Sequence, residues 1–208
     1  MFFMLIALLG CSEDKDSLNK SLLEATLSLN GVKMDQLIKK GADVDSIFAK
    51  TSGGIELTLL EHVYNTDIPF KEKTLCCELL LLKGANPDIK FAIGEEYLLH
   101  NLVALQNKDE ALFAVIGLLH NWNADVNKRD KGGGRTALYH AIFNGREGAG
   151  VLEIVQYLIY RGADTNIKMY TEYGPKTIIE IVQQDLMIIH PISKEKLLEV
   201  LSSGPTNL

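Results

Sequence analysis

Histidine and cysteine are the side chains best suited to metal binding or nucleophilic chemistry, and this sequence has few of either. The histidines are spread along the chain, at His62, His100, His120, His140 and His190. A zinc site needs three or four converging ligands, and helical zinc sites commonly space two histidines as H-x-x-x-H. No such pair is present, so we expect no metal site.

The cysteines are Cys11, near the start, and the adjacent pair Cys76 and Cys77. No C-x-x-C spacing exists, so neither a zinc site nor a thioredoxin-like motif is available. Adjacent residues on a helix point about 100° apart, so a disulfide between Cys76 and Cys77 would be strained. We expect both to be buried thiols that act as small hydrophobic side chains.

Gly132, Gly133 and Gly134 form a glycine run that could suggest a phosphate-binding loop. A P-loop needs G-x-x-x-x-G followed by Lys and Ser or Thr, and these do not follow here. No G-x-S-x-G or H-E-x-x-H motif is present either. The sequence therefore predicts neither an enzyme nor a cofactor, and a turn with one extra glycine explains the run.

The charge of the chain bears on its partners. The formal net charge is -6 and the sequence pI is about 5.4. Nucleic-acid binding requires a basic face. We therefore expect no nucleic-acid partner.

A short signal recurs along the chain and organises the rest of it. Its copies read G-A-D-V-D, G-A-N-P-D, N-A-D-V-N and G-A-D-T-N, and they begin at Gly41, Gly84, Asn123 and Gly162. Each copy follows an apolar stripe at helical spacing, which predicts an amphipathic helix that ends at a left-handed cap, where Gly or Asn costs least. A fifth, degenerate copy ends at Gly204.

The stripe residues are expected three, four, seven and eight places before each signal. They are Ile38, Leu37, Met34 and Lys33; Leu81, Leu80, Cys77 and Cys76; His120, Leu119, Ile116 and Val115; and Ile159, Leu158, Val155 and Ile154. In the third set, His120 takes the place of an apolar core residue at the end of a helix. A cation there would suit the helix dipole.

The segment from Asn123 to Ala141, N-A-D-V-N-K-R-D-K-G-G-G-R-T-A-L-Y-H-A, resembles the junction between two ankyrin repeats. The family pattern is G-A-D-V-N-x-x-D-x-x-G-x-T-P-L-H-x-A. The resemblance implies an all-α ankyrin-repeat solenoid of about five helix pairs joined by long finger loops, over residues 17–208. It also implies a structural role for His100, which falls on the motif histidine, whereas His140 lies one place past it.

In this family, partners usually bind the fingers and the inner helices along the concave face. Residues on these elements that we expect to contact a protein partner are Phe48, Ile55, Phe91, Ile93, Arg129, Lys131, Arg135, Tyr139, Met169, Tyr170 and Tyr173. Loop aromatic residues are typical anchors of protein interfaces, and the basic group would steer an acidic partner. The alternative is that the long fingers fold over each other and bury the apolar members.

Residues 1–10 are almost entirely apolar and are followed by Cys11 and a charged segment. Leu8-Leu9-Gly10-Cys11 is similar to a bacterial lipobox, which implies a lipoprotein signal peptide at 1–10 and a lipidated Cys11 with a short tether at 11–16. The run is too short for a transmembrane helix. The alternative is a hydrophobic N-terminal helix packed against the first repeat.

Together these features predict a non-catalytic, monomeric protein-interaction module, exported and lipid-anchored in a bacterial envelope with its folded part facing the periplasm. One alternative is an envelope immunity protein or inhibitor of a toxic effector. Another is a cytosolic scaffold whose apolar start is structural.

Overall fold

The computed structural model describes residues 14–50, 54–105, 108–144, 150–184 and 194–203. These residues form ten helices and four short strands, which fits the predicted all-α class. The chain divides into two compact units. The first contains the described residues up to Ala49 together with Thr58–Ala85, and the second contains Lys50–Leu57 and the described residues from Asn86 onwards.

The first unit is built from helices α1 (Lys15–Leu27), α2 (Gly31–Lys39), α3 (Leu59–Asn65) and α4 (Phe70–Leu82). Helix α1 packs against the other three, and its Leu22 is fully buried. The buried Cys76 on α4 donates its thiol hydrogen to the carbonyl of Thr26, 3.4 Å away. Cys76 and Cys77 are therefore free, buried thiols, as predicted from their helical spacing.

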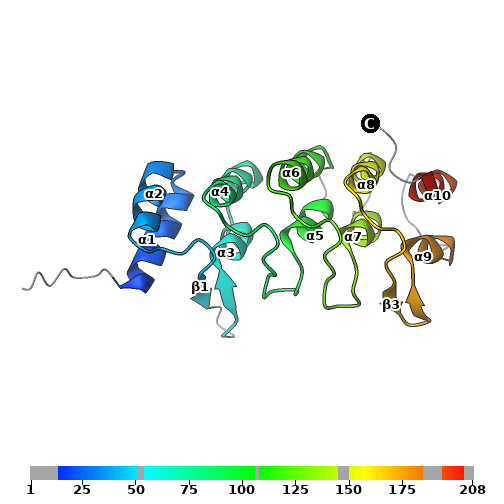
Figure 1. Ribbon diagram of the computed structural model, residues 1–208, viewed down its shortest axis with the longest axis horizontal. Helices are drawn as coiled ribbons and strands as arrows, with labels where there is room; N and C mark the ends of the chain where they lie inside the picture. Colours follow the sequence, from blue (N-terminus) through cyan, green and yellow to red (C-terminus); the bar gives the residue numbers. More distant parts are fainter. Residues whose placement is uncertain (1–13, 51–53, 106–107, 145–149, 185–193, 204–208) are drawn as a thin grey trace, which may run out of the picture. The chain divides into compact units, whose positions relative to one another are not determined.

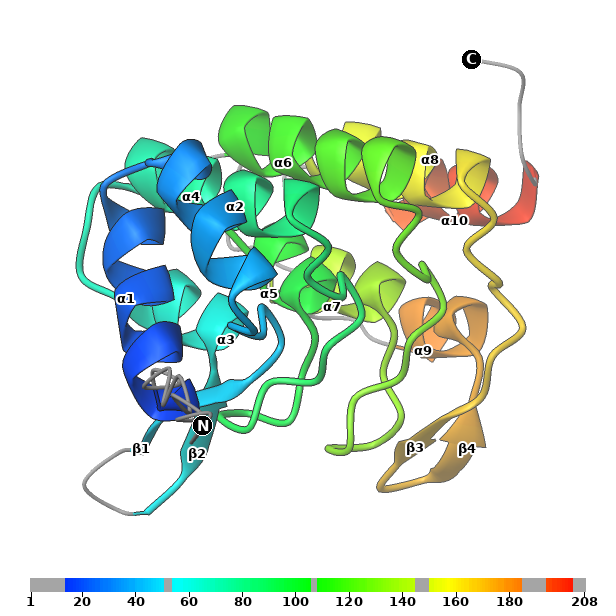
Figure 2. The same ribbon diagram turned by 60° about the vertical axis from the view of Figure 1, so that its left-hand side comes forward.

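The second unit contains α5 (Leu98–Val103), α6 (Lys108–Asn121), α7 (Ala137–Phe143), α8 (Val151–Tyr160), α9 (Ile178–Gln184) and α10 (Lys194–Ser203). Within this unit α6, α8 and α10 form one layer, and α5, α7 and α9 form a second (Figures 1 and 2). The connecting fingers extend beyond the second layer. The unit's core lies between the layers, where Leu138 and Ile142 of α7 and Ile154 and Leu158 of α8 are fully buried.

The recurring signals mark helix ends with left-handed backbone, as predicted. The φ angles are 109° at Gly41, 95° at Gly84, 51° at Asn123 and 89° at Gly162. After each glycine, the next amide donates to the carbonyl five residues back, as Ala163 does to Leu158 at 2.9 Å. This bond satisfies a carbonyl that the end of the helix leaves without an intrahelical partner.

The third apolar stripe was predicted one residue out of phase. His120 and Ile116 are exposed, and Ala114 and Leu118 are buried in their place. The reason lies at the cap, where the amide of Ala124 donates to the carbonyl of Leu118, six residues back, at 3.4 Å. One extra residue at this helix end moves every inward-facing position one place towards the N-terminus.

The fingers contain short strands that the repeat pattern did not predict. Strands β1 (Ile47–Lys50) and β2 (Glu56–Thr58) lie where the chain passes between the two units. In the second unit, β3 (Met169–Thr171) and β4 (Gly174–Lys176) pair antiparallel, with Tyr170 opposite Pro175. The hairpin turns at Glu172 and Tyr173, and Gly174, the first residue of β4, has a φ of 95° that suits glycine.

Within the described ranges, no helix combines the length and the apolar character needed to cross a bilayer. The predicted signal peptide at 1–10 and Cys11 lie outside those ranges. So do His190 and the predicted copy end at Gly204.

Candidate functional site

The fingers of the second unit carry most of the side chains that the sequence marks for binding. We name three of them by their residues: the 90–97 finger, the 128–135 finger and the 169–176 finger. Each leads into an inner helix, α5, α7 or α9. The buried polar side chains of His100, Asp130 and His140 lie at the base of the 128–135 finger.

Asp130 closes the base of the 128–135 finger. Its backbone amide donates to the carbonyl of Arg135, and its Oδ1 accepts from the amide of Arg135, both at 2.9 Å. Its Oδ2 lies 3.1 Å from Nε2 of His140 on α7. Asp130 and His140 are both buried, so each satisfies a polar group that would otherwise lack a partner.

Both ring nitrogens of His140 have a polar partner. Nε2 lies against the carboxylate of Asp130, and Nδ1 lies 2.8 Å from the side-chain amide nitrogen of Asn144. Glu96, from the 90–97 finger, lies farther away, with Oε1 4.0 Å from Nδ1. His140 thereby ties the 128–135 finger to the inner helix that follows it.

His100 stacks on His140, with ring centroids 4.7 Å apart and planes 14° apart. Its Nε2 donates to the carbonyl of Lys128 at 3.0 Å, which links α5 to the next finger. Burial, followed by the nearby His140, lowers the pKa of His100 from 6.5 to about 4, so the ring is neutral at pH 7. This geometry fits the structural role that the motif position implied.

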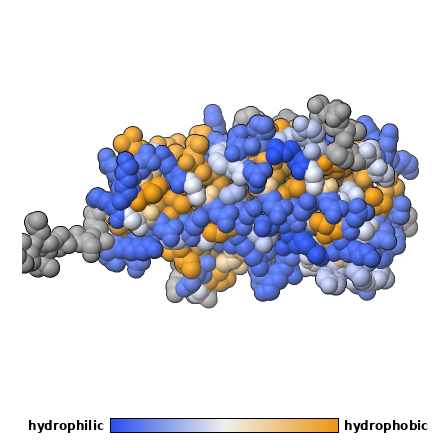
Figure 3. Space-filling model, viewed as in Figure 1, coloured by the Kyte–Doolittle hydropathy of each residue, from blue (hydrophilic) through white to orange (hydrophobic). Residues whose placement is uncertain are grey.

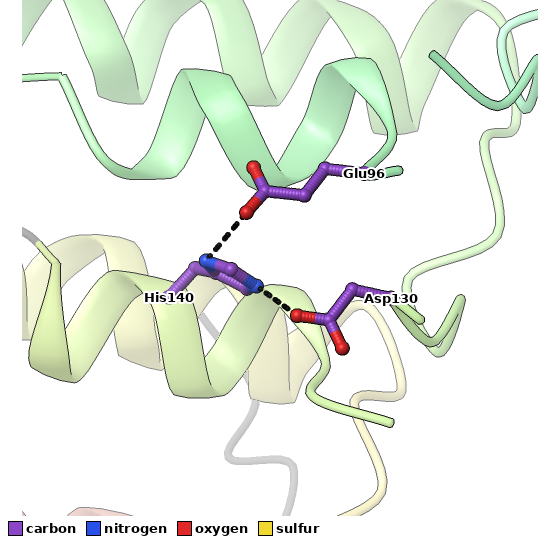
Figure 4. A group of neighbouring side chains, drawn as sticks. All are labelled: Glu96, Asp130 and His140. Atoms are coloured by element: carbon purple, nitrogen blue, oxygen red, sulfur yellow. Dashed lines mark hydrogen bonds and ion pairs between the residues drawn. The ribbon is translucent and has the colours of Figure 1, made fainter. Parts of the chain in front are cut away.

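Glu96, Asp130 and His140 each place a ligand atom within 4.8 Å of the others, a spacing that a metal ion could use. The two ring nitrogens of His140, however, point in opposite directions, one towards each carboxylate (Figure 4). An ion on either nitrogen would lie across the ring from one carboxylate. The arrangement therefore favours a structural chain of hydrogen bonds over a metal centre.

The glycine run of the 128–135 finger permits close packing against the next finger. Gly134 has a φ of 69°, and a Cβ there would lie 2.5 Å from Nη2 of Arg129. The amide of Tyr170 donates to the carbonyl of Gly133 at 2.8 Å. A finger turn therefore explains the run, as the sequence predicted.

Two of the predicted basic contacts are already engaged within the protein. Arg129 donates from Nε to Gly134 O at 3.1 Å and from Nη2 to Lys168 O at 2.7 Å, so it joins two fingers. Lys131 lies 2.7 Å from Glu95, and its hydrogen bond is the main reason that the pKa of Glu95 is lowered. Arg129 has a structural task, and the charge of Lys131 is partly neutralised.

Arg135 is placed differently. Its guanidinium lies over the ring of Tyr139, 4.9 Å from the centroid, and Tyr139 in turn stacks on Phe143 at 4.7 Å. No carboxylate among the described residues forms an ion pair with Arg135. These three half-buried side chains form a cation–aromatic stack along α7, which we call the α7 stack.

The apolar finger residues divide between surface and interior. Tyr170 and Tyr173 have relative exposures of 71% and 77%, and Ile55 and Ile93 are also exposed. Lys176 lies over the ring of Tyr173 at 4.9 Å. These side chains and the α7 stack are available to a partner. The side chain of Phe48 lies outside the described part of the chain.

Phe91 and Met169 are buried, which corrects the expectation that they are exposed. Successive side chains on a strand point to opposite faces, so Met169 faces inward where Tyr170 faces solvent. At Phe91 the amide donates to the carbonyl of Glu96 at 2.8 Å, which closes the finger over its side chain. Phe91 and Met169 therefore follow the alternative prediction, in which packing of the fingers buries their apolar side chains.

Comparison with known proteins adds one finding. Residues 70–169 match the family model of ankyrin repeats, in three copies. This match supports an ankyrin-repeat protein, and domains of that kind are typically non-catalytic modules for protein–protein interaction. No match to the chain was found among curated proteins.

Proposed function

We propose that this chain binds an acidic segment of a protein partner through the fingers and inner helices of its second unit, while a lipid on Cys11 holds it in a bacterial envelope. The ankyrin-repeat match supports the general role of a protein-interaction module. The partner's charge and the anchor are the finer parts of the proposal.

The observation that carries the binding site is the α7 stack. Arg135 offers a guanidinium beside an aromatic surface, and Tyr139 and Phe143 supply that surface at low cost in side-chain entropy. Arginine and tyrosine are among the residues that dominate the energy of protein interfaces. A carboxylate on the partner would pair with Arg135, and an adjacent apolar side chain would cover the rings.

Tyr170 and Tyr173 extend this surface onto the neighbouring finger. Because the amide of Tyr170 is bonded to Gly133, the two fingers keep their spacing without a partner. A surface that is already ordered loses less conformational entropy on binding. The site is therefore suited to a partner that meets two adjacent fingers at once.

The binding test is affinity purification of the full chain from its native envelope, followed by mass spectrometry. We expect one partner at stoichiometric yield from wild type, and its loss in the variants Arg135→Glu and Tyr170→Ala. The matched control is Tyr160→Ala, an exposed tyrosine on the outer helix α8 of the same unit. A hot-spot residue contributes about 2 kcal/mol or more, or roughly thirtyfold in affinity. Equal capture by all variants would reject this surface.

The anchor is tested separately, by growing cells with an alkyne-tagged fatty acid. The tag should appear on wild type and be absent from Cys11→Ser, because the thiol at Cys11 is the proposed attachment atom. Equal labelling of the two proteins, or no labelling of either, would reject the lipid anchor and leave the binding surface standing.

A further inference from the structure

The first unit exposes a cluster of aliphatic side chains on the surface of α2 and α4. We call Leu29, Val32, Leu75, Leu79 and Leu82 the outer apolar patch. Val32 and Leu82 each have a relative exposure of 70%, and Leu29 and Leu75 are also exposed. Figure 3 shows apolar side chains gathered over this part of the unit.

The start of α2 lies close to the leucines of α4. Leu75, Leu79 and Leu82 are spaced i, i+4 and i+7 on α4, so they lie along one face. A Cβ added at Gly31, the first residue of α2, would lie 3.5 Å from Cδ1 of Leu79. Gly31, which lies between Leu29 and Val32 in the sequence, is therefore close to the middle of the α4 stripe.

Helix α2, which borders the patch, carries more lysine than acid, although the chain as a whole is acidic. Helix α2 carries Lys33 and Lys39. Asp35 is the acid of α2, and it is paired with Lys83 at 2.7 Å. On α4, Glu72 and Glu78 are matched by Lys71 and Lys73.

We propose that the outer apolar patch rests on the surface of an anionic phospholipid bilayer when the chain is anchored at Cys11. This inference depends on the lipid anchor of the proposed function. Aliphatic side chains would enter the boundary between headgroups and acyl chains, and the lysines would face lipid phosphates. Each lysine held near an anionic surface contributes about fivefold in partitioning.

Composition favours a bilayer over a protein as the occupant. The patch holds only leucine and valine, whereas the energetic centres of protein interfaces are enriched in Trp, Tyr and Arg, with Leu and Val under-represented. In the second unit Tyr170 and Tyr173 lie on the 169–176 finger, and Arg135 lies over the ring of Tyr139. Aliphatic residues bordered by lysine are what a membrane-surface helix presents.

The tether has the length that this contact needs. Three residues separate Cys11 from Lys15, where α1 begins, and their extended reach is about 14 Å. Helix α1 has 13 residues and is about 20 Å long, and its C-terminal end leads into Leu29. With Cys11 in the membrane, the tether and α1 together are long enough for the patch to reach the same surface.

The test is a protection experiment on the full, anchored chain. Val32→Cys and Tyr173→Cys each place a thiol at a site of similar exposure, in the patch and on a finger respectively. Cys76 and Cys77 are buried, so a membrane-impermeant maleimide should report mainly on the new thiol. The protein is placed in vesicles of phosphatidylethanolamine and phosphatidylglycerol, then in detergent micelles, and the labelling rates are compared.

We expect the thiol of Val32→Cys to react at least fivefold more slowly in vesicles than in micelles, and that of Tyr173→Cys to react alike in both. Vesicles without phosphatidylglycerol, or high salt, should reduce the protection.

Equal rates for Val32→Cys in vesicles and micelles would overturn bilayer docking, although a protein retained on the vesicles would still carry its anchor. Protection that persists in micelles would also overturn it. Such protection would indicate a second copy if it depends on protein concentration and residues 1–10 if it does not. A protein that does not associate with vesicles would overturn both the anchor and the docking.

Discussion

The buried ring of His100 should make the stability of the folded chain depend on pH in a defined direction. The ring is fully buried, its Nε2 donates to Lys128, and it stacks on His140. Burial, with a smaller contribution from His140, lowers its pKa from 6.5 to about 4. The unfolded chain therefore binds more protons than the folded chain between these two values. The stabilisation is complete above pH 6.5 and is lost as the pH falls towards 4.

The size of the effect follows from the two pKa values. Between pH 7.5 and pH 5, a histidine with a pKa of about 4 when folded and 6.5 when unfolded costs about 2 kcal/mol of unfolding free energy. This is a large part of the stability of a typical domain. Other titrating groups add their own pH dependence, so a comparison with a variant that lacks the ring is needed.

The assay is urea denaturation at pH 7.5 and pH 5.0 of wild type, His100→Gln and His120→Gln. The His100→Gln variant keeps an amide donor near Lys128 but has no group that titrates in this range. Wild type should lose about 2 kcal/mol more than His100→Gln on acidification. His120, which is exposed at the end of α6, serves as the control, and its variant should behave as wild type does. Equal losses for wild type and His100→Gln would refute the reasoning.

Two further predictions concern the backbone and the thiols. Gly134→Ala should lower the urea midpoint more than Gly162→Ala does. Both glycines have left-handed backbone, which costs about 1 kcal/mol for alanine. Only at Gly134 would the new methyl group also clash with Arg129. Equal midpoints would show that Arg129 moves aside freely. Cys76 and Cys77 should resist a thiol reagent at pH 8 until urea unfolds the chain, because burial raises the pKa of Cys77 to about 12 and also raises that of Cys76. Rapid reaction of both thiols in the folded protein would contradict this.

The helices were predictable from the sequence because their signals are local. Inward-facing residues recur at three and four places, and a residue with positive φ ends the outer helix, so Gly84 and Gly162 fix the phase of the stripes before them. The same rule failed before Asn123, where the cap holds one more residue. That residue changes no apolar spacing within α6. It changes only the distance from the stripe to the cap, which a pattern aligned on the cap cannot detect.

The cluster beneath the fingers could not be predicted in this way, because its members meet only through packing of α5 on α7. His140 lies one place past the motif histidine, yet its ring stacks on that of His100 and receives Asp130 from the preceding finger. In the family pattern the aspartate lies eight residues before the histidine, whereas Asp130 and His140 are ten residues apart. The consequence for binding is nevertheless direct. The backbone of Arg135 is hydrogen-bonded to Asp130, and Tyr139 is next to His140 in the sequence. The α7 stack therefore lies beside side chains that are already hydrogen-bonded and buried. A partner that binds there meets a preformed surface, and little of its binding energy is lost to ordering the finger.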